Sequence, residues 1–248
     1  MGKKIRVQRR GRGGSTFKAS THHRVASSRY PYIENLDATS LVKATVEDLI
    51  HESGRGAPIA KTKLESGKVF HVVAPEGISI GQEIQVGSSA QPAIGNIMPI
   101  GKIPSGTFLC NIELRPGDGG KLVRSSGTYA SLVSHTSEGT LVKLPSGKSM
   151  YLNDYCLATI GVMSGAGRID KPFLKAGKKQ HWMYAKGRVY PVTKGVAMNA
   201  VSHPHGGGSH KSKSLRPTSV SRTAPPGQKV GLIAARQSGI SKKRRRTT

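Results

Sequence analysis

The chain has 248 residues, and its 39 lysine and arginine side chains outnumber its 13 aspartate and glutamate side chains, which gives a formal net charge of +26. This excludes a domain of ordinary, balanced charge, because such an excess of like charges repels itself and lowers folding stability. The charge is tolerable beside a polyanion, so we expect nucleic acid as the partner.

The basic residues are segregated along the chain. Residues 1–33 hold 9 basic and no acidic side chains, residues 34–170 hold 12 basic and 13 acidic ones, and residues 171–248 hold 18 basic and no acidic ones. This pattern predicts a near-neutral folded body with a strongly cationic arm at each end.

The N-terminal arm carries four arginines and three glycines within nine residues, in the run RVQRRGRGG. Guanidinium groups pair with phosphates in a bidentate manner, and glycines let a backbone enter narrow clefts. A flexible solubilising tail and a nuclear import signal are the alternatives. Because the C-terminal arm is also basic, we favour contact with RNA through Arg6, Arg9, Arg10 and Arg12.

The middle of the chain predicts many short strands, because runs rich in valine, isoleucine, leucine and threonine are separated by glycine-containing turns. The expected strands are 41–50, 68–74, 83–88, 96–103, 108–114, 139–146 and 156–163. Turns this dense favour one or two small barrels, which close their own edges, over one large sandwich. We divide this all-β body near residue 90. With 5% aromatic residues, we expect aliphatic cores and little aromatic surface for base stacking.

Cys110 and Cys156 are the two cysteines of the chain. No zinc-type spacing is present, so we expect both to be reduced core residues. No apolar stretch follows the basic N-terminus, and no 18 apolar residues run together, so the sequence predicts neither secretion nor a membrane span. We expect an intracellular, reducing compartment.

Glycine-rich tracts in the body resemble phosphate-binding loops at first sight. The tract GKS over 147–149 lacks the required first glycine, since Val142 occupies that position, and it lies between two expected strands, so we predict a hairpin turn. The tracts GDGGK over 117–121 and SGAGRID over 164–170 are expected to be turns as well. For both, contact with RNA phosphates is an equally supported alternative.

The C-terminal arm is rich in glycine, proline, serine and lysine, and it shows no sustained helical or strand period. We therefore expect an irregular segment that becomes ordered on its partner. The tract PPGQKVGLIAARQSGI near 225–240 predicts one or two helical turns, and the final KKRRRTT predicts a solvated or phosphate-bound tail.

The tract AMNAVSHPHGGG over 197–208 allows three interpretations: a metal site of His203, His205 and His210, a general base at His203, or a compact loop that packs into RNA. No carboxylate follows Asp170 and both cysteines precede it, which disfavours a metal site. A general base needs an orienting partner and a positioned nucleophile, and this arm offers no acid. We favour the compact loop.

Tracts spread along the chain resemble the large-subunit ribosomal protein two family (the universal L-two family). They are RGRGGSTFKASTHHR, RPGDGGKLVRSSGT, VKLPSGK, ATIG, GRIDKP-LKAGKK, GVAMNAVSHPHGGG and APPGQKVGLIAARQSG. Their order and spacing match the family across nearly the whole chain. The ending GLIAAR and the early STF resemble the archaeal and eukaryotic branch.

The resemblance implies an all-β fold with an oligonucleotide-binding-type barrel over 34–90 and an SH3-like barrel over 91–190. Long basic irregular extensions over 1–33 and 191–248 are expected to flank the barrels and enter the rRNA. The implied function is that of a structural constituent of the large ribosomal subunit, in cytoplasmic ribosomes. It would bind rRNA near the peptidyl-transferase region, contact neighbouring ribosomal proteins and lie near the small-subunit interface. No membrane, small-molecule substrate or cofactor is expected, apart from Mg ions shared with rRNA.

The expected rRNA-binding residues are basic side chains of the arms and turns, together with the histidine loop. They are Arg6, Arg9, Arg10, Arg12, Lys18, Arg24, Lys121, Arg124, Arg168, Lys171, Lys175, Lys178, Lys179, Lys194, Asn199, His203, His205, Gly206, Gly207, Gly208, Lys211, Lys213, Arg222, Lys229 and Arg236. We expect no catalytic residue and no resident metal.

The histidine of the family that matches His203 has been discussed for peptide-bond formation, whereas the reaction itself is attributed to RNA. We therefore expect His203 to face RNA without a catalytic role. The residue before this histidine is usually acidic in the family and is Ser202 here. A serine cannot hold a protonated imidazole as a carboxylate would, which weakens any charge-pair role.

Two other protein classes compete with this interpretation. An enzyme using His203 or the GKS turn would need an acidic partner or a complete phosphate loop, and the sequence holds neither. A DNA-compacting protein would share the cationic tails, but two barrels and a histidine loop are more than compaction requires. A preference for structured RNA over duplex DNA would separate the DNA-compacting class from an RNA-binding protein.

Overall fold

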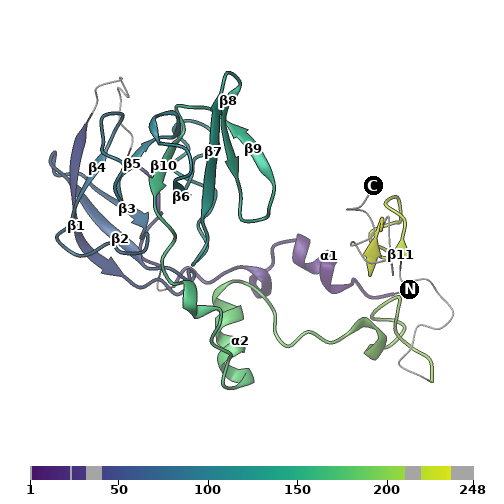
Figure 1. Ribbon diagram of the computed structural model, residues 1–248. Coiled ribbons are helices and arrows are strands. Elements are labelled where there is room, and N and C mark those ends of the chain that lie inside the picture. The colour runs from purple at the N-terminus through teal and green to yellow at the C-terminus, as the bar shows by residue number, and fades with distance from the viewer. Residues whose placement is uncertain (1, 23, 32–40, 210–218, 236–248) are drawn as a thin grey trace. The chain divides into compact units, whose positions relative to one another are not determined.

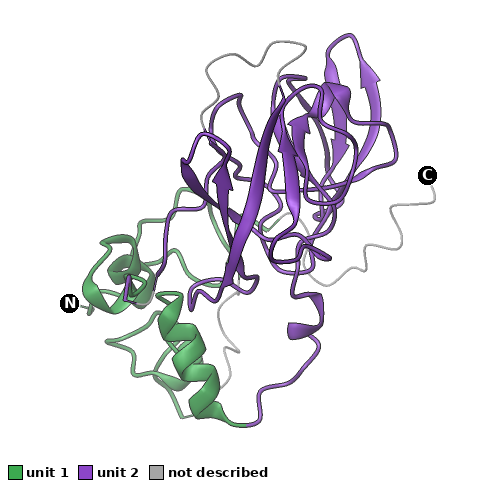
Figure 2. Cartoon of the chain, turned by 90° about the vertical axis from the view of Figure 1, so that its left-hand side faces the viewer, with its two compact units in different colours: residues 1–20, 175–248 green, residues 21–174 purple. Residues whose placement is uncertain are grey.

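The computed structural model describes residues 2–22, 24–31, 41–209 and 219–235. The chain divides into two compact units (Figure 2). Residues 21–174 form one unit, which we call the barrel body. Residues 1–20 together with 175–248 form the other unit, which we call the arm unit. In the described ranges, no helix is both long enough and apolar enough to cross a membrane.

The first four strands of the barrel body form an antiparallel arrangement (Figure 1). They are β1 (Val42–Ile50), β2 (Ile59–Leu64), β3 (Val69–Val73) and β4 (Glu83–Val86). β1 lies between β2 and β4, and β2 also pairs with β3. Within β2, buried Ala60, Thr62 and Leu64 alternate with the more exposed lysines, as the two-residue period of a strand requires.

The other six strands of the barrel body build a second barrel. They are β5 (Ile97–Pro99), β6 (Phe108–Cys110), β7 (Ala130–Thr136), β8 (Gly139–Lys143), β9 (Ser149–Leu152) and β10 (Leu157–Ile160). β10 pairs with β5 and β6, and the order continues through β7 and β8 to β9. A parallel pairing of Val86 in β4 with Ile97 in β5 joins the two barrels in one continuous sheet.

The expected all-β class, an oligonucleotide-binding-type barrel followed by an SH3-like barrel, is confirmed. Each barrel has its own hydrophobic core. The GKS tract is the expected hairpin turn between β8 and β9, closed by Leu144 N–H donating to Lys148 O at 2.8 Å. The strands β2, β7 and β9 were not predicted. Their outward positions carry mainly lysine, serine, threonine, histidine or tyrosine, so they lack the apolar runs that mark the other strands, and they are paired with neighbouring strands.

The cores are filled mainly by isoleucine, valine and leucine, as expected. The expectation of little aromatic surface was wrong. Among the described residues, the buried aromatic side chains are Tyr30 and Phe70. Because aliphatic residues already fill both cores, most other aromatic rings lie at the surface. The exposed ones are Phe108, Tyr129, Tyr151, Tyr155, Phe173 and Tyr184.

The two cysteines are buried and free, as expected. Burial raises the pKa of the Cys110 thiol to about 12 and that of the Cys156 thiol to about 11. Both therefore stay protonated at neutral pH and behave as small apolar core residues.

Part of the basic N-terminal segment is built into the barrel body. Tyr30 lies in the first core, where its hydroxyl donates to Asn111 O at 2.5 Å and lies 2.7 Å from Thr159 Oγ1. Arg29 N–H donates to His71 O at 2.9 Å. The compact body thus begins before residue 34. It ends at Leu174, which lies inside the range 91–190 expected for the second barrel.

The arm unit is mostly irregular and contains short elements from both ends of the chain. They are α1 (Arg6–Gly11), η1 (Ser15–Phe17), α2 (Ala176–Ala185), η4 (Gly195–Ala197), β11 (Ser219–Val220) and β12 (Leu232–Ile233). Lys3 N–H donates to Val201 O at 2.8 Å, so the two arms meet although they lie at opposite ends of the sequence.

The helix α2 was not predicted, since we expected no sustained helical period after residue 170. None of its residues is buried. Its alanine, lysine, glutamine and methionine residues favour a helix, but without an apolar face the sequence carries no periodic signal. The helical turns expected near 225–240 are reduced to one turn, in which Lys229 N–H donates to Pro225 O at 3.1 Å. Gly231, at φ 78°, then redirects the chain, and residues 236–240 lie outside the described ranges.

Candidate nucleic-acid interface

Four arginines from distant parts of the chain lie around the loop 52–57 of the barrel body. One precedes β1, one belongs to the loop, one follows β6 and one lies in the short helix η3 (Ala166–Arg168) after β10. We call them the arginine cluster: Arg24, Arg55, Arg124 and Arg168. The tertiary fold thus concentrates positive charge that is scattered in the sequence.

Two glycines of the loop allow the guanidinium groups to approach its backbone. A Cβ added to Gly54 would lie 3.4 Å from the Arg24 guanidinium, and one added to Gly56 would lie 2.5 Å from Arg168 Nη2. A larger residue at position 56 would therefore displace Arg168, whereas the distance at Gly54 is an ordinary van der Waals contact. Arg168 Nη2 also donates to Ser126 Oγ at 2.9 Å, which fixes its orientation.

The guanidinium group of Arg124 donates hydrogen bonds to uncharged backbone carbonyls. Its Nη1 donates to Gly120 O at 2.9 Å and its Nη2 to Ser28 O at 3.0 Å. Burial lowers the pKa of Arg124, and the positive charge of Arg55 lowers it further. Arg55 itself contacts the buried carboxylate of Glu52. Burial and the like charge of Arg55 both disfavour the charged form of Arg124, and a bound phosphate would stabilise it.

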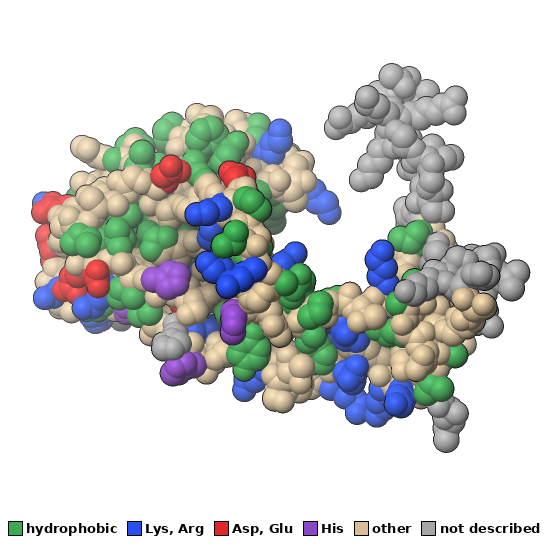
Figure 3. Space-filling view, turned by 90° about the horizontal axis from the view of Figure 1, so that it is seen from below, with side chains coloured by type: hydrophobic (Ala, Val, Ile, Leu, Met, Phe, Trp, Pro, Cys, Tyr) green, Lys and Arg blue, Asp and Glu red, His purple; other side chains and the backbone are tan. Residues whose placement is uncertain are grey.

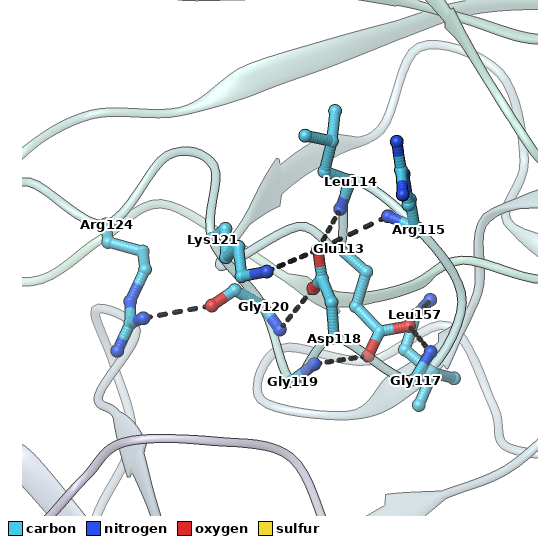
Figure 4. Close-up of polar contacts among 10 residues, drawn as sticks. All are labelled: Glu113, Leu114, Arg115, Gly117, Asp118, Gly119, Gly120, Lys121, Arg124 and Leu157. Atoms are coloured by element: carbon cyan, nitrogen blue, oxygen red, sulfur yellow. Dashed lines mark hydrogen bonds and ion pairs between the residues drawn. The ribbon is translucent and has the colours of Figure 1, made fainter.

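The loop after β6 is shaped by two carboxylates (Figure 4). Glu113 is buried and accepts hydrogen bonds from Gly117 N–H at 3.2 Å, Gly119 N–H at 2.8 Å and Leu157 N–H at 2.9 Å. Its carboxylate therefore holds the glycine turn against β10. This loop is the expected turn at 117–121.

Asp118 organises the outer side of the same loop. Its carboxylate accepts from Leu114 N–H at 3.1 Å and from Gly120 N–H at 3.1 Å, and it lies 3.5 Å from Lys121 Nζ. Hydrogen bonds to Glu113 and Asp118 fix the backbone of this loop on its buried and its exposed side. The backbone therefore holds the cations at the loop surface in defined positions. Lys121 is exposed there.

The histidine tract of the arm unit is a compact loop, as expected. A Cβ added to Gly195 would lie 2.3 Å from His203 Cε1, and one added to Gly206 would lie 2.3 Å from Met198 O. His205 N–H donates to His203 Nδ1 at 3.0 Å, and the two rings meet edge to face with centroids 4.9 Å apart. A side chain at Gly195 would collide with the His203 ring, and one at Gly206 would collide with the backbone of Met198, so both positions require glycine.

A cavity of about 420 Å³ lies beside this loop in the arm unit. No carboxylate lines it, and its lining combines cations of the N-terminal arm with residues of the histidine loop. The lining residues are Lys3, Lys4, Arg6, Arg9, Met198, Ser202 and His203. Such a cavity suits an anionic group such as phosphate.

Cations near α2 lie over aromatic rings. Lys186 Nζ is 4.0 Å from the Trp182 ring centroid, and Lys179 Nζ is 5.2 Å from that of Tyr190. These contacts hold the ammonium groups near the surface without neutralising them.

Most of the expected rRNA-binding residues that the structure describes are exposed. The exposed ones in the barrel body are Arg24, Lys121, Arg168 and Lys171, and those in the arm unit are Arg9, Arg10, Arg12, Lys18, Lys175, Lys178, Lys194, Asn199, Gly207, Gly208 and Arg222. The partly buried ones are Arg6, Arg124, Lys179, His203, His205, Gly206 and Lys229. Lys211, Lys213 and Arg236 lie outside the described residues.

Sequence reasoning missed three features of the site. Arg55 was overlooked because it stands alone in a near-neutral region. Glu113 gave no signal, since burial of its carboxylate depends on the fold. Lys3 and Lys4 were counted in the charge but not singled out, although they line the cationic cavity.

A metal site was disfavoured on the sequence. Within the described ranges, no group of three or more histidine, cysteine, aspartate or glutamate side chains could hold a metal ion. His210, the third histidine of that interpretation, lies outside those ranges.

The charge is distributed very unequally between the two units. The arm unit holds 24 basic and no acidic residues, whereas the barrel body holds 15 basic and 13 acidic ones. Figure 3 shows lysine and arginine side chains on many parts of the visible face, whereas carboxylates occur in a few places. A surface of this kind binds polyanions.

Comparisons with known proteins agree with this chemistry. The chain matches the family model "Ribosomal Proteins L2, RNA binding N-terminal domain" over residues 1–86 and "Ribosomal Proteins L2, C-terminal domain" over residues 93–224. It is 50% identical over 247 residues to the large ribosomal subunit protein uL2 of Korarchaeum cryptofilum, covering 100% of this chain and 99% of that relative. It is 52% identical over 242 residues to the same protein of Desulfurococcus amylolyticus, covering 98% and 100%. The chain therefore belongs to the Ribosomal Proteins L2 family, in its archaeal-type branch.

Proposed function

We propose that this chain is a structural, rRNA-binding component of the large ribosomal subunit, located in cytoplasmic ribosomes, and that it is not an enzyme. Membership of the family and the names of its relatives support this role. The observation that carries it is the arginine cluster, in which a rigid β body holds four guanidinium groups together and one of them has a lowered pKa because of burial and a like charge.

The mechanism is electrostatic. Phosphates that meet the arginine cluster and the arm unit release their counterions, and this release drives binding. Fixed guanidinium groups lose little conformational freedom on binding, because Arg124 and Arg168 are already held by hydrogen bonds. The protein thereby neutralises rRNA segments whose mutual repulsion would keep them apart.

We also propose where the chain lies in the large subunit and what it contacts there. The chain would lie near the peptidyl-transferase region, contribute to subunit association, and contact neighbouring ribosomal proteins. All the residues expected to bind rRNA are proposed contacts, with Mg ions shared between protein and RNA. The two barrels would divide near residue 90, between β4 and β5.

His203 is proposed to face RNA in a packing role. Its Nδ1 accepts the backbone N–H of His205 at 3.0 Å, and its ring lies against Gly195. The neighbouring residue is Ser202, and the arm unit contains no carboxylate that could hold a protonated imidazole. This supports a structural histidine over a general base.

The test measures binding of the full chain to a large-subunit rRNA transcript over a range of salt concentrations. The variant is Arg24→Gln with Arg168→Gln, since both side chains are exposed. Arg55 is left intact because its removal would leave the buried Glu52 without its cation. Each lost phosphate contact should reduce the slope of log affinity against log salt by about 1, so we expect a decrease of about 2.

The matched control is Lys68→Gln with Lys148→Gln, which removes the same charge from two exposed turn positions of the barrel body. It should change the slope much less. Equal effects of both double variants would show that total charge, rather than the arginine cluster, governs binding. Equal affinity of the wild-type chain for duplex DNA and for rRNA would contradict the proposed function.

A further inference from the structure

A hollow on the second barrel is lined by two half-exposed aromatic rings. Phe108 is 49% exposed and Tyr129 47% exposed. Their ring centroids are 4.6 Å apart and their planes are inclined by 56°. The cavity that they line has a volume of about 430 Å³ and also includes Ser131 and Lys143. We call it the aromatic hollow.

The register of the sheet places these side chains on one outward face. Phe108 in β6 pairs with Ser131 in β7, which in turn pairs with Lys143 in β8. Paired residues of neighbouring strands point to the same face, and Tyr129 lies two residues before Ser131, so it is the diagonal neighbour of Phe108. The intervening residue Ala130 points inward and is buried.

The two rings have no role in the hydrophobic core. The core beneath them is filled by aliphatic residues such as Leu109, Leu132 and Val142, which are almost fully buried. Two adjacent aromatic rings at a surface leave apolar area in water, and this costs free energy that a partner could recover. An exposed aromatic pair in a hollow therefore indicates a binding surface.

The chemistry of the hollow favours a nucleobase. Its lining contains no carboxylate, and Lys143 supplies a positive charge at its rim. Ser131 and Thr128 add hydroxyl groups beside the rings. Its volume lies within the range of about 300–1,000 Å³ that is usual for small-ligand sites. A flat base can stack on an aromatic ring while a cation meets its phosphate, which is how proteins hold unstacked bases of RNA.

We propose that the aromatic hollow is a stacking site for an unstacked nucleobase of RNA. Phe108 and Tyr129 supply the stacking surface and Lys143 meets the adjoining phosphate. This inference rests on the proposed function of rRNA binding and adds to it a stacking contact made by aromatic rings. Stacking on the rings is insensitive to salt, whereas the phosphate contact of Lys143 depends on salt, as do those of the arginine cluster.

The test again uses the full chain and a large-subunit rRNA transcript. In the variant Phe108→Leu with Tyr129→Leu, the hollow keeps apolar side chains but loses both rings. Loss of stacking should weaken binding about 5- to 100-fold. The slope of log affinity against log salt should stay unchanged, because no phosphate contact is removed. The control is Tyr151→Leu, since Tyr151 is 51% exposed on the same barrel but does not line the hollow.

The outcomes separate the inference from the function on which it rests. If wild-type and leucine variant bind rRNA equally with the same salt slope, the stacking site is overturned while rRNA binding stands. If Tyr151→Leu weakens binding as much as the double variant, the loss is general and the inference also fails. If the wild-type chain shows no preference for rRNA, the proposed function itself fails.

A second measurement does not depend on the folding of any variant. Ultraviolet irradiation of the wild-type complex, followed by digestion and mass spectrometry, should find a nucleotide joined to the peptide containing Phe108 or Tyr129. Cross-links to peptides of the arms with none to these two peptides would overturn the stacking site.

Discussion

The barrel body and the arm unit differ in their hydrophobic cores and in their balance of charge. The barrel body combines two hydrophobic cores with 15 basic and 13 acidic residues. The arm unit has 24 basic residues and no acidic one, and its buried apolar residues in the described ranges are Ile5 and Val230. The body therefore has the means to fold alone, whereas the arm unit lacks both a core and internal counter-charges.

This difference also separates two ways of presenting cations. On the barrel body, fixed backbone and buried carboxylates such as Glu113 set where a guanidinium or ammonium group lies. In the arm unit, glycines allow segments of the backbone to approach closely, and residues from both ends of the sequence come together there. The partner's phosphates must supply the negative charge that the arm unit lacks, so its stability depends on binding.

The largest expected effect comes from Glu113→Ala, which should destabilise the barrel body by about 4 kcal/mol. The substitution leaves the buried N–H groups of Gly119 and Leu157, and that of Gly117, without their acceptor. Urea unfolding followed by far-ultraviolet circular dichroism measures the change. Glu138→Ala, at an exposed turn, is the control and should change little. A loss below about 1 kcal/mol would mean that the loop does not depend on this carboxylate.

A somewhat smaller effect tests whether the two units unfold independently. Leu109→Ala should destabilise the barrel body by about 3 kcal/mol, because it opens a cavity in the second core. Val230→Ala should affect the arm unit alone. Trp182, the single tryptophan, lies in the arm unit, so its fluorescence reports that unit while circular dichroism is dominated by the strands of the body. Parallel shifts of both signals in both variants would show that the units form one cooperative structure.

The smallest expected effect concerns the ion pair of Glu47 and Lys61 on the outer face of the first barrel, where Nζ and Oε2 are 2.8 Å apart. The hydrogen bond from Lys61 lowers the pKa of Glu47 below its ordinary 4.5, and the pair raises the pKa of Lys61 above 10.5. The carboxylate thus adds stability above pH 4.5 that is lost as the pH falls through its folded value. The ammonium group adds stability below pH 10.5 that is lost as the pH rises through its folded value.

Glu47→Gln should therefore lower the unfolding temperature slightly at pH 7 and leave it close to that of the wild type in strong acid. Thermal unfolding at both pH values measures this. Glu65→Gln, at an exposed turn position, controls for the loss of one charge. A difference that persists unchanged in acid would exclude the ion pair as its cause.

Much of the fold was predictable from local patterns. Apolar runs and glycine turns predicted β1, β3, β4 and most strands of the second barrel, and the turn between β8 and β9 followed from Gly147. The strands β2, β7 and β9 were missed because polar residues interrupt their apolar residues, so their sequences lack the apolar runs that mark the other strands, although they pair with their neighbours in the sheet. The helix α2 was missed because it buries no residue.

The site was predictable in part. Charge counting along the chain identified the cationic arms, and the three glycines after His205 predicted a compact loop. Counting could not predict the arginine cluster, since Arg24 and Arg168 were assigned to different segments and Arg55 stood alone. It also gave a wrong expectation for the aromatic residues, because a low content says nothing about which of them are buried.

The sequence by itself determined that the chain is a polycation with a β body, because its charge, its runs of valine, isoleucine, leucine and threonine, and its glycine turns are properties of the chain alone. Only the tertiary structure decided which cations lie together and which rings remain exposed. The reason is physical: closing the strands into barrels fixes their register, and register determines which side chains of distant segments share a face.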